Sequence, residues 1–326
     1  MFTPRVTARI LRSVFVGLYV PSKKIPQRFC QQKMGMETIK LSTGGCMPVL
    51  GLGTWQSKDE NELTRALKTA LDCGYRLIDT AFVYGNESII GKTLNDYFKD
   101  GKLRREDIFI TSKKEDDSFA PAFVNDMQVP IVIDHLDTWH ALEKLYDAGK
   151  LKALGLSNFN ATQVKNVYDH ARIKPANLQV ECHLYWPQTE LYELCKKLNI
   201  SFTAYGPLGS RGRKEFNPNM KWPEADPLSD IIVKELAQKH GKTPAQILLR
   251  HLIQRGMAVI PKSVKPERVK ENFDVFDFSL SDDEMTKLNS IDTRTRLFLF
   301  DFAIGHPFYP FEEVDQSKMS MISLKA

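Results

Sequence analysis

The alternation of short β-type runs with helical segments, which begins at Cys46, is the feature that most constrains the fold of this chain. Strict strand–helix alternation over the length of one domain predicts a parallel sheet, either closed as a barrel or open and doubly wound. No G-x-G-x-x-G pattern follows any of the β-type runs, which disfavours a doubly wound, dinucleotide-binding fold. The expected strands are Met47–Trp55, Tyr75–Ala81, Ile108–Lys113, Leu151–Ser157, Leu178–Cys182, Ser201–Tyr205 and Met257–Ser263. The expected helices are Glu60–Cys73, Glu87–Phe98, Asp137–Ala148, Glu190–Leu198 and Leu228–Ile253.

The spacing of these strands indicates a barrel that lacks one βα unit. Most successive strands begin about 23 to 33 residues apart, the length of one βα unit. The interval between the third and fourth strands is longer, yet it holds only one clear helix after the acidic, irregular stretch Glu115–Asp126. Seven strands are recognisable where a closed barrel of this type needs eight. Val129–Ile133 is either a makeshift eighth strand or a loop. The polar loop Gly206–Pro227 is typical of an active-site loop on the top face of a barrel.

Composition and charge exclude two classes of protein. With 42% apolar and 26% charged residues, the chain resembles a soluble globular protein with a sizeable core. No apolar run approaches the roughly 18 residues needed to span a bilayer, so no membrane partner is expected. Residues 1–35 hold seven basic and no acidic side chains, and the rest of the chain has 38 basic and 40 acidic residues. A nearly neutral body gives no electrostatic basis for binding nucleic acid.

Residues 1–35 differ from the rest of the chain. Arg5, Arg9 and Arg12 recur at helical spacing beside an apolar stripe, and an Arg-rich leader without acidic residues is typical of a mitochondrial presequence. The alternatives are an artefact of the gene model, with Met34 or Met36 as the working start, and a secretory signal. We therefore expect a cytoplasmic or mitochondrial protein whose residues 1–35 are disordered and dispensable for folding.

The cysteines bear on redox compartment and on metal binding. The five are scattered and show no C-x-x-C or metal-ligand spacing. An odd, scattered set is typical of buried thiols in a reducing compartment and argues against secretion. We expect free thiols and no metal site. The cysteines are Cys30, Cys46, Cys73, Cys182 and Cys195.

Three polar residues at neighbouring strand ends form a candidate acid catalyst. Asp79 ends the second expected strand, Tyr84 lies in the turn beyond it, and Lys113 ends the third strand. Barrels place their active sites at this end of their strands. The ordinary pKa of tyrosine, about 10, is too high for efficient proton donation near neutrality. We expect the Lys113 ammonium to lower the pKa of Tyr84, with Asp79 holding the lysine charged. The alternative is a structural Asp79–Lys113 ion pair with Tyr84 at the rim.

A second candidate site is an anion site at the start of a late helix. Pro266 suits the first turn of a helix, and a helix N-terminus flanked by basic side chains and hydroxyls attracts phosphate. Lys262, Ser263 and Arg268 could together bind a 2′-phosphate, which favours NADP over NAD. The alternative is a set of basic side chains that simply face solvent.

Successive segments of the chain resemble the signature motifs of the aldo-keto reductases, most closely the aldose/aldehyde reductase branch. In family order they are GLGTW (Gly51–Trp55), YRLIDTAFVYGNE (Tyr75–Glu87), ITSK (Ile110–Lys113), GLSNFN (Gly155–Asn160), NLQVECH (Asn177–His183), AYGPLGS (Ala204–Ser210) and IPKSVKPERVKENF (Ile260–Phe273). The resemblance runs from about Met36 to Pro310, and several independent motifs in order make it specific. It implies a (β/α)8 TIM barrel over residues 36–316, truncated between 114 and 137, with a tail at 317–326. It also implies NADPH-dependent reduction of aldehydes and ketones to alcohols.

The resemblance also implies roles for individual residues. Asp79, Tyr84 and Lys113 fall on three of the family's four catalytic positions, with Tyr84 as proton donor. Trp55, together with Tyr84, would bound the pocket of a small carbonyl substrate. The positions that match the family's NADPH/NADP+ contacts are Gly53, Thr54, Asp79, Ser157, Asn158, Gln179, Tyr205, Pro261, Lys262, Ser263, Val264, Arg268, Glu271 and Asn272. Within that set, the side chains of Ser157, Asn158 and Gln179 would hold the nicotinamide, and Tyr205 would stack on it. Without the family, Ser157–Asn158 reads as a helix cap and Tyr205 as a core aromatic. A monomer is expected.

The chain departs from the family pattern at the fourth catalytic residue, a histidine that ends the fourth strand. No such segment follows Lys113–Lys114, and Glu115–Pro121 resembles the loop that comes after that histidine. We therefore expect the family's third helix and fourth strand, about 40 residues, to be absent, and none of the seven histidines offers an obvious replacement. We expect impaired activity. The alternatives are a catalytically inactive NADP-binding isoform and a gene-model artefact.

Overall fold

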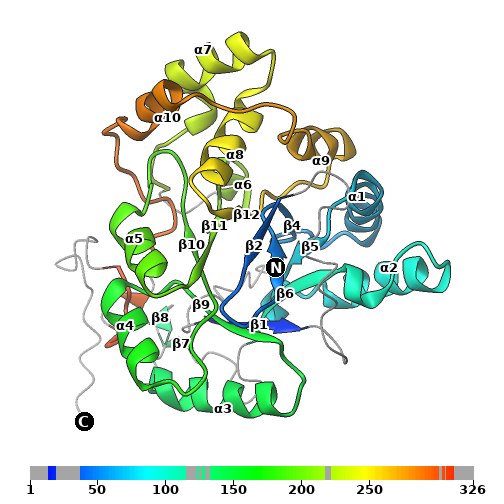
Figure 1. Cartoon of the computed structure of the whole chain (residues 1–326), viewed down its shortest axis with the longest axis vertical. Helices are drawn as coiled ribbons and strands as arrows, with labels where there is room; N and C mark the ends of the chain where they lie inside the picture. Colours follow the sequence, from blue (N-terminus) through cyan, green and yellow to red (C-terminus); the bar gives the residue numbers. More distant parts are fainter. Residues whose placement is uncertain are drawn as a thin grey trace.

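The computed structural model contains a closed barrel of eight strands surrounded by helices (Figure 1). It describes residues 37–114, 123–124, 127–128, 133–216, 222–300, 303–304 and 306–311, and the backbone of residues 14–19. The strands follow one another around the sheet in the order β12-β11-β10-β9-β1-β6-β5-β4. Isolated bridges from Leu50 to Val259 and from Gly53 to Lys262 close the ring between its first and last strands.

Seven strands of the described barrel are the ones that the alternation predicts. Neighbours among these seven are parallel, and β1 stands between β6 and β9. Among the described residues, the place between β6 and β9 holds the antiparallel β1 and no parallel strand. The seven are β4 (Gly51–Gly53), β5 (Leu77–Asp79), β6 (Phe109–Lys114), β9 (Ala153–Ser157), β10 (Asn177–Glu181), β11 (Ser201–Tyr205) and β12 (Ala258–Val259). A hairpin of β2 (Thr38–Lys40) and β3 (Cys46–Pro48) precedes them.

The helices pack around the outside of the barrel (Figure 1). Their ends carry the capping groups that the local sequence provides. In α1, for example, the Asp59 side chain accepts the N–H of Glu62 and Gly74 closes the helix with φ 111°. The α-helices are α1 (Glu60–Cys73), α2 (Glu87–Lys99), α3 (His135–Asp147), α4 (Ala161–His170), α5 (Thr189–Lys197), α6 (Arg213–Phe216), α7 (Ile231–His240), α8 (Pro244–Gln254), α9 (Pro266–Phe273) and α10 (Asp282–Asn289). No helix in the described ranges is long and apolar enough to cross a bilayer.

The expectation of one continuous helix over Leu228–Ile253 is wrong. Helix α7 ends at Gly241, which has φ 62°, and α8 begins at Pro244 after a capping box between Thr243 and Gln246. A left-handed residue followed by a proline cannot continue a helix, so the apolar periodicity of the two helices runs through a real break.

The interior of the barrel is apolar at one end and polar at the other, and this sets the position of the site. Leu77 and Phe109 belong to an interior apolar cluster together with Met47 from the β2–β3 hairpin. Side chains two or four residues apart in a strand share a face. The residue two positions after Leu77 in β5 and the residue four positions after Phe109 in β6 therefore also point into the barrel, nearer its other end. These residues are Asp79 and Lys113. The interior is therefore apolar toward the N-terminal ends of the strands and polar toward their C-terminal ends.

The eighth strand, β1 (Val14–Tyr19), comes from the segment that the sequence predicts to be a disordered leader. It lies antiparallel between β6 and β9, with Val16 opposite Lys113 on one side and Gly155 on the other. For residues 14–19 the expectation of disorder is therefore wrong; the rest of 1–35 lies outside the described residues. The physical reason is that, without β1, β6 and β9 would each leave a row of backbone N–H and C=O groups unpaired, and an extended segment can pair with both rows. The other segment considered for this place, Val129–Ile133, lies almost entirely outside the described residues, as does the 317–326 tail.

Pairing on both sides makes β1 sensitive to proline. Val16→Pro removes a backbone N–H and should lower the free energy of unfolding by about 1–3 kcal/mol, the cost of a buried group left without a partner. Val16→Thr keeps the N–H and the β-branched shape, so it serves as the control at the same position. Urea denaturation followed by circular dichroism compares the two. Equal midpoints for both variants and the parent would show that β1 does not contribute to the folded state.

Three of the expected free cysteines are confirmed and one is not. Cys73, Cys182 and Cys195 are free thiols, whereas Cys46 is disulfide-bonded. In the described part of the chain, no group of three or more His, Cys, Asp or Glu residues is arranged to hold a metal ion.

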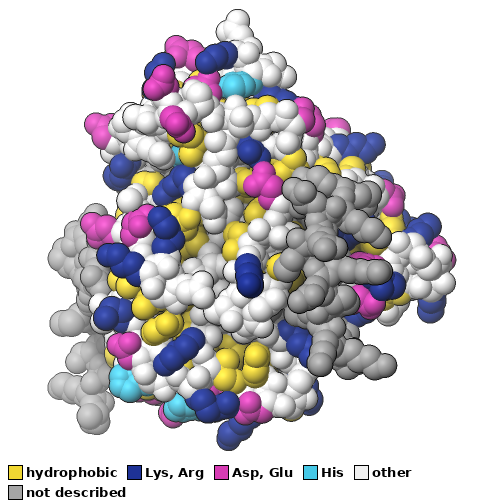
Figure 2. Space-filling view, in the orientation of Figure 1, with side chains coloured by type: hydrophobic (Ala, Val, Ile, Leu, Met, Phe, Trp, Pro, Cys, Tyr) yellow, Lys and Arg dark blue, Asp and Glu magenta, His cyan; other side chains and the backbone are white. Residues whose placement is uncertain are grey.

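The charged surface is mixed rather than segregated by sign. Lys and Arg side chains are interspersed with Asp and Glu on the face shown in Figure 2. Exposed pairs such as Lys92–Glu60 and Arg172–Asp147 are formed at 2.8 and 2.6 Å. Exposed pairs of this kind contribute little to stability, but their mixture keeps any single sign from dominating that face.

Candidate functional site

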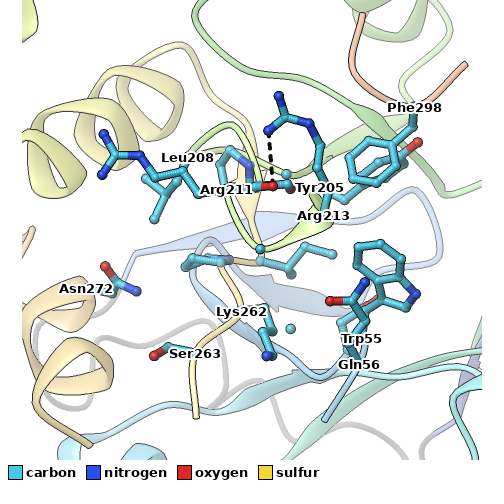
Figure 3. Close-up of a pocket in the computed structure, with 18 of the residues that line it drawn as sticks. Trp55, Gln56, Tyr205, Leu208, Arg211, Arg213, Lys262, Ser263, Asn272 and Phe298 are labelled. Carbon is cyan, nitrogen blue, oxygen red and sulfur yellow. Dashed lines mark hydrogen bonds between the residues drawn. The ribbon is translucent and has the colours of Figure 1, made fainter. Parts of the chain in front are cut away.

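A cavity of about 530 Å³ opens at the C-terminal ends of the barrel strands. The sequence predicts the candidate residues at these strand ends, and they come from the seven segments that resemble the family motifs. Two of them, Thr54 and Val264, do not line the cavity. The predicted residues that do are Gly53, Trp55, Asp79, Tyr84, Lys113, Ser157, Asn158, Gln179, Tyr205, Pro261, Lys262, Ser263, Arg268, Glu271 and Asn272. In Figure 3, Ser263 and Asn272 lie at one side of the pocket and Trp55 and Phe298 at the other.

Asp79 and Lys113 form a buried ion pair. The Lys113 Nζ lies 2.6 and 2.7 Å from the two carboxylate oxygens of Asp79 and 3.1 Å from the Thr80 carbonyl. Gln179 Nε2 donates to Asp79 Oδ1 at 2.8 Å, so the carboxylate has a fixed orientation. Burial lowers the pKa of Lys113, and the adjacent Asp79 charge opposes that shift. The pair therefore holds one cation and one anion rigidly beside the cavity.

Tyr84 lies next to this pair, but its proton affinity differs from the prediction. The Lys113 Nζ is 5.6 Å from the centre of the Tyr84 ring. Desolvation, and secondarily the Asp79 carboxylate, raise the pKa of Tyr84 well above its ordinary value. The expectation that Lys113 lowers it is therefore wrong for this state of the protein. The main reason is burial, which disfavours the charged phenolate, while the Lys113 ammonium bonds both carboxylate oxygens of Asp79. Tyr84 consequently keeps its proton at neutral pH.

A polar cluster lies on the neighbouring strands. Asn158 has φ 57°, a left-handed conformation that asparagine tolerates, and its N–H donates to the Gln179 carbonyl at 3.1 Å. Its side-chain oxygen accepts the Tyr205 hydroxyl at 3.0 Å. Ser157 and Gln179 are both buried and both line the cavity. Amide and hydroxyl groups that converge in this way beside an aromatic ring suit a planar carboxamide-bearing ring.

Gly53 brings the first strand against the last. Its N–H donates to the Pro261 carbonyl at 3.1 Å, and a Cβ at this position would lie 2.6 Å from the Ile260 carbonyl oxygen. Only glycine permits this approach, which sets Lys262 at the edge of the cavity. Thr54 is fully buried, and both its N–H and its hydroxyl bond to the Asp79 carbonyl. Thr54 thus supports Asp79 from below rather than facing the cavity.

The candidate anion site lies at the start of α9. Lys262 and Arg268 are exposed, and Ser263 Oγ accepts the Lys265 N–H at 3.1 Å. Partial burial lowers the pKa of Lys262, with Glu62 and Glu215 opposing that shift. Asn272 is buried at the cavity wall. Two cations and the free N–H groups of a helix start therefore face the same opening.

Two residues that the sequence reasoning missed organise the site. Asn86 is fully buried, accepts the Thr80 hydroxyl and donates to the Thr54 and Ser57 carbonyls, which fixes the turn that carries Tyr84. Arg213 is buried in the Gly206–Pro227 loop and donates to carbonyls of Gly209, Ser210, Pro223 and Ala225. An asparagine just before a helix was a usable signal for the first. Nothing local distinguishes Arg213 from its exposed neighbour Arg211.

An aromatic wall closes the other end of the cavity. The ring of Phe298 meets those of Trp55, Tyr205 and Trp222 edge-on, with centroids 5.5, 5.6 and 5.9 Å away. Such T-shaped contacts are favourable for aromatic pairs. Trp55 was predicted as a wall residue; Phe298 and Trp222 were not, because the segments that carry them show no recognisable periodicity.

No histidine of the described residues lines the cavity. His183, the last residue of the NLQVECH segment, is fully buried and bonds to Glu181. His240 and His251 pair with Glu284 and Asn289 on the outer helices. His135 is buried between the rings of Phe159 and Phe308, and burial lowers its pKa to about 4.

Comparisons with known proteins agree with this arrangement. The model of the aldo/keto reductase family matches residues 49–126 and 121–293. Aldo-keto reductase family 1 member A1 of Bos taurus is 39% identical over 328 residues, which span 86% of this chain and 99% of the bovine protein. The corresponding A1-A protein of Danio rerio is 40% identical over 85% of this chain and 98% of its own. The structure of the aldose reductase from Schistosoma japonicum is similar with a TM-score of 0.76 at 39% identity, covering 85% and 99% of the two chains.

Proposed function

Because the chain belongs to the aldo/keto reductase family, we propose that it is an NADPH-dependent oxidoreductase that reduces aldehydes and ketones to alcohols. The observation that carries the proposal is the convergence of Tyr84, the Asp79–Lys113 ion pair and the Ser157–Asn158–Gln179 cluster on one cavity. An acid, an oriented cation and a set of amide donors and acceptors are what carbonyl reduction by a bound nicotinamide requires.

The residues present fit this cofactor by their chemistry. Asn158 and Gln179 can bond a carboxamide, Tyr205 offers a ring face, and Lys262 with Arg268 can meet a phosphate. When bound, NADPH supplies the hydride. Tyr84 gives its hydroxyl proton to the carbonyl oxygen, and its high pKa ensures that the proton is present. Lys113 stabilises the phenolate that remains, and Asp79 keeps Lys113 in place. The aromatic wall of Trp55 and Phe298 excludes water from the reacting atoms.

The direct test is NADPH-dependent reduction of a reactive aromatic aldehyde, followed by loss of NADPH absorbance, beside NADPH binding measured by fluorescence. Binding with turnover supports the reductase. Binding without turnover supports a second candidate, a protein that holds NADP and performs no chemistry. Neither binding nor turnover contradicts both.

The second candidate is favoured by one observation, the lack of a histidine at the cavity among the described residues. The alignment with the bovine relative spans 328 positions, although it uses only 86% of this 326-residue chain. The family model also matches in two pieces that meet at residues 121–126. Both facts support a family segment without counterpart after Lys113, and hence an impaired rather than a fully active reductase.

Replacing Arg268 with Ala should weaken NADPH binding by about 1–3 kcal/mol, the contribution of a charge-assisted hydrogen bond, and NADH binding far less. The reason is that a 2′-phosphate is present only in NADPH, and Arg268 lies at the cavity beside the start of α9. Dissociation constants for both cofactors, measured by fluorescence titration, check this. Arg294→Ala is the control, since that exposed arginine bonds only neighbouring carbonyls within its own loop in the described contacts. Equal weakening of both cofactors by Arg268→Ala would contradict the NADPH preference.

A further inference from the structure

A carboxylate that the proposed chemistry does not use is buried next to the cavity. Glu181 ends β10, two residues beyond Gln179 on the same face of the strand, and is fully buried. A buried charge is costly unless it is paired and hydrogen-bonded. Its partners therefore show what the residue holds in place.

The partners of Glu181 come from the chain's C-terminal segment and from one buried histidine. Its Oε1 accepts the Leu297 N–H at 2.6 Å, and its Oε2 accepts the Phe298 N–H at 3.0 Å. His183 Nε2 lies 2.9 Å from Oε1, and an Arg296 guanidinium nitrogen lies 3.9 Å from Oε2. Burial raises the pKa of Glu181, but His183 and Arg296 outweigh it, so the pKa lies below its ordinary value.

The same segment is fastened at two further points. The Arg296 guanidinium carbon lies 4.6 Å from the centre of the Trp186 ring and 3.8 Å from that of Phe311, so the cation is held between two rings. The Thr295 N–H donates to the Tyr185 carbonyl at 2.8 Å. These contacts hold the segment near the barrel. Among the described residues, the two oxygens of Glu181 bond the consecutive backbone N–H groups of 297 and 298 and so set the register of the chain there.

The register of the chain at 297 and 298 determines the position of the Phe298 ring in the aromatic wall. Phe298 meets Trp55 edge-on at the same side of the pocket in Figure 3, and Phe300 lines the same cavity. We infer that Glu181 is a positioning residue: through the backbone of Leu297 and Phe298 it aims the Phe298 ring at the place where the substrate's apolar part binds. The kinetic consequence rests on the proposed carbonyl reduction, whereas the anchoring itself does not.

The variant Glu181→Gln tests the anchor with little change of volume. A glutamine has one acceptor oxygen and one NH2 donor, so one of the two backbone N–H groups must face another donor. The control is Glu284→Gln. Glu284 is also buried, also accepts a backbone N–H (Ser281) and also bonds a histidine (His240), but it lies on the outer helix α10 and does not line the cavity. It controls for the general cost of neutralising a buried carboxylate.

The first measurement is hydrogen exchange at the amides of Leu297 and Phe298 in the protein without added cofactor. Glu181→Gln should speed exchange there by about 10–100-fold, and Glu284→Gln should leave it unchanged. The second measurement is kinetic. Glu181→Gln should raise KM for an aromatic aldehyde about 10-fold, with kcat and the NADPH dissociation constant unchanged to within about twofold. A general loss of structure would instead lower kcat and weaken NADPH.

A double-mutant cycle with Phe298→Ala makes the assignment specific. If Glu181 acts through Phe298, KM of the double variant should equal that of Phe298→Ala alone. Additive effects, or faster exchange without any change in KM, would overturn the positioning role. Unchanged exchange in Glu181→Gln would overturn the anchor itself. If the parent protein shows no turnover, the proposed function fails independently, and aldehyde affinity for the NADP+-bound protein, read by tryptophan fluorescence, replaces KM with the same expected 10-fold weakening.

Discussion

Replacement of Tyr84 with Phe should lower kcat for aldehyde reduction by about 10²–10⁴-fold, the usual contribution of a positioned general acid. The phenol is the proton source that the geometry offers, since it lies beside the Asp79–Lys113 pair and its raised pKa keeps it protonated. NADPH binding should stay within about twofold, because phenylalanine keeps the ring and the phosphate contacts are remote. Single-turnover measurements with saturating NADPH isolate the chemical step. A Tyr84→Phe variant within tenfold of the parent would require another acid.

The same residue predicts the pH dependence. A group whose pKa is raised keeps its proton as pH increases, so the donor remains available throughout the neutral range. The rate of the chemical step should therefore be flat from about pH 7 to about pH 10, the ordinary tyrosine pKa, and fall only above it. A decline with a midpoint below that value would show that the cofactor or substrate brings Lys113 closer to the phenol than in this structure.

Restoring a family segment of typical length after Lys113 should raise kcat/KM by about 10²–10³-fold, the value of one hydrogen bond to the reacting oxygen. A further gain can come from Lys113, because misplacement of a catalytic group by about 1 Å costs about 10²-fold. In the present chain Lys113 is paired through its backbone with Val16 of an antiparallel strand rather than with a parallel neighbour. Steady-state reduction of an aromatic aldehyde by the two proteins measures the difference.

Two controls separate the histidine from the strand. The same inserted segment with its histidine changed to glutamine should recover only the part that comes from the strand. The insertion should also displace β1, so Val16→Pro should no longer destabilise the longer protein. Comparable kcat/KM for the parent and the restored protein would show that the gap after Lys113 has little effect on catalysis.

The place between β6 and β9 is filled by a segment that local pattern does not indicate. From the sequence, the candidate for the place between β6 and β9 is the Val129–Ile133 run, which is either a makeshift eighth strand or a loop. The structure instead fills the place with residues 14–19, which belong to a segment that reads as a leader. Amphipathic spacing in that segment was interpreted as a helix for targeting, but its Val14–Tyr19 run is equally suited to a strand when two open ladders are within reach.

Local pattern was enough for most of the barrel. Strand and helix periodicities depend on residues within one element. The rule that parallel strands share their C-terminal edge was enough to place Asp79 and Lys113 together, whereas Ser157 and Gln179 followed only from the resemblance to the family. Three features depended on the tertiary structure alone. The pKa of Tyr84 is raised rather than lowered because burial and the direction of the Lys113 ammonium are set by the whole site. Strand β1 pairs with β6, 91 to 99 residues later in the chain, and with β9, 135 to 143 residues later. The contact of Glu181 with the amide of Phe298, 117 residues later in the chain, aims an aromatic ring that no periodicity reveals. Periodicity indicates which face of an element is apolar. The desolvation of a side chain and the pairing of distant strands depend instead on which remote residues surround them in the folded protein.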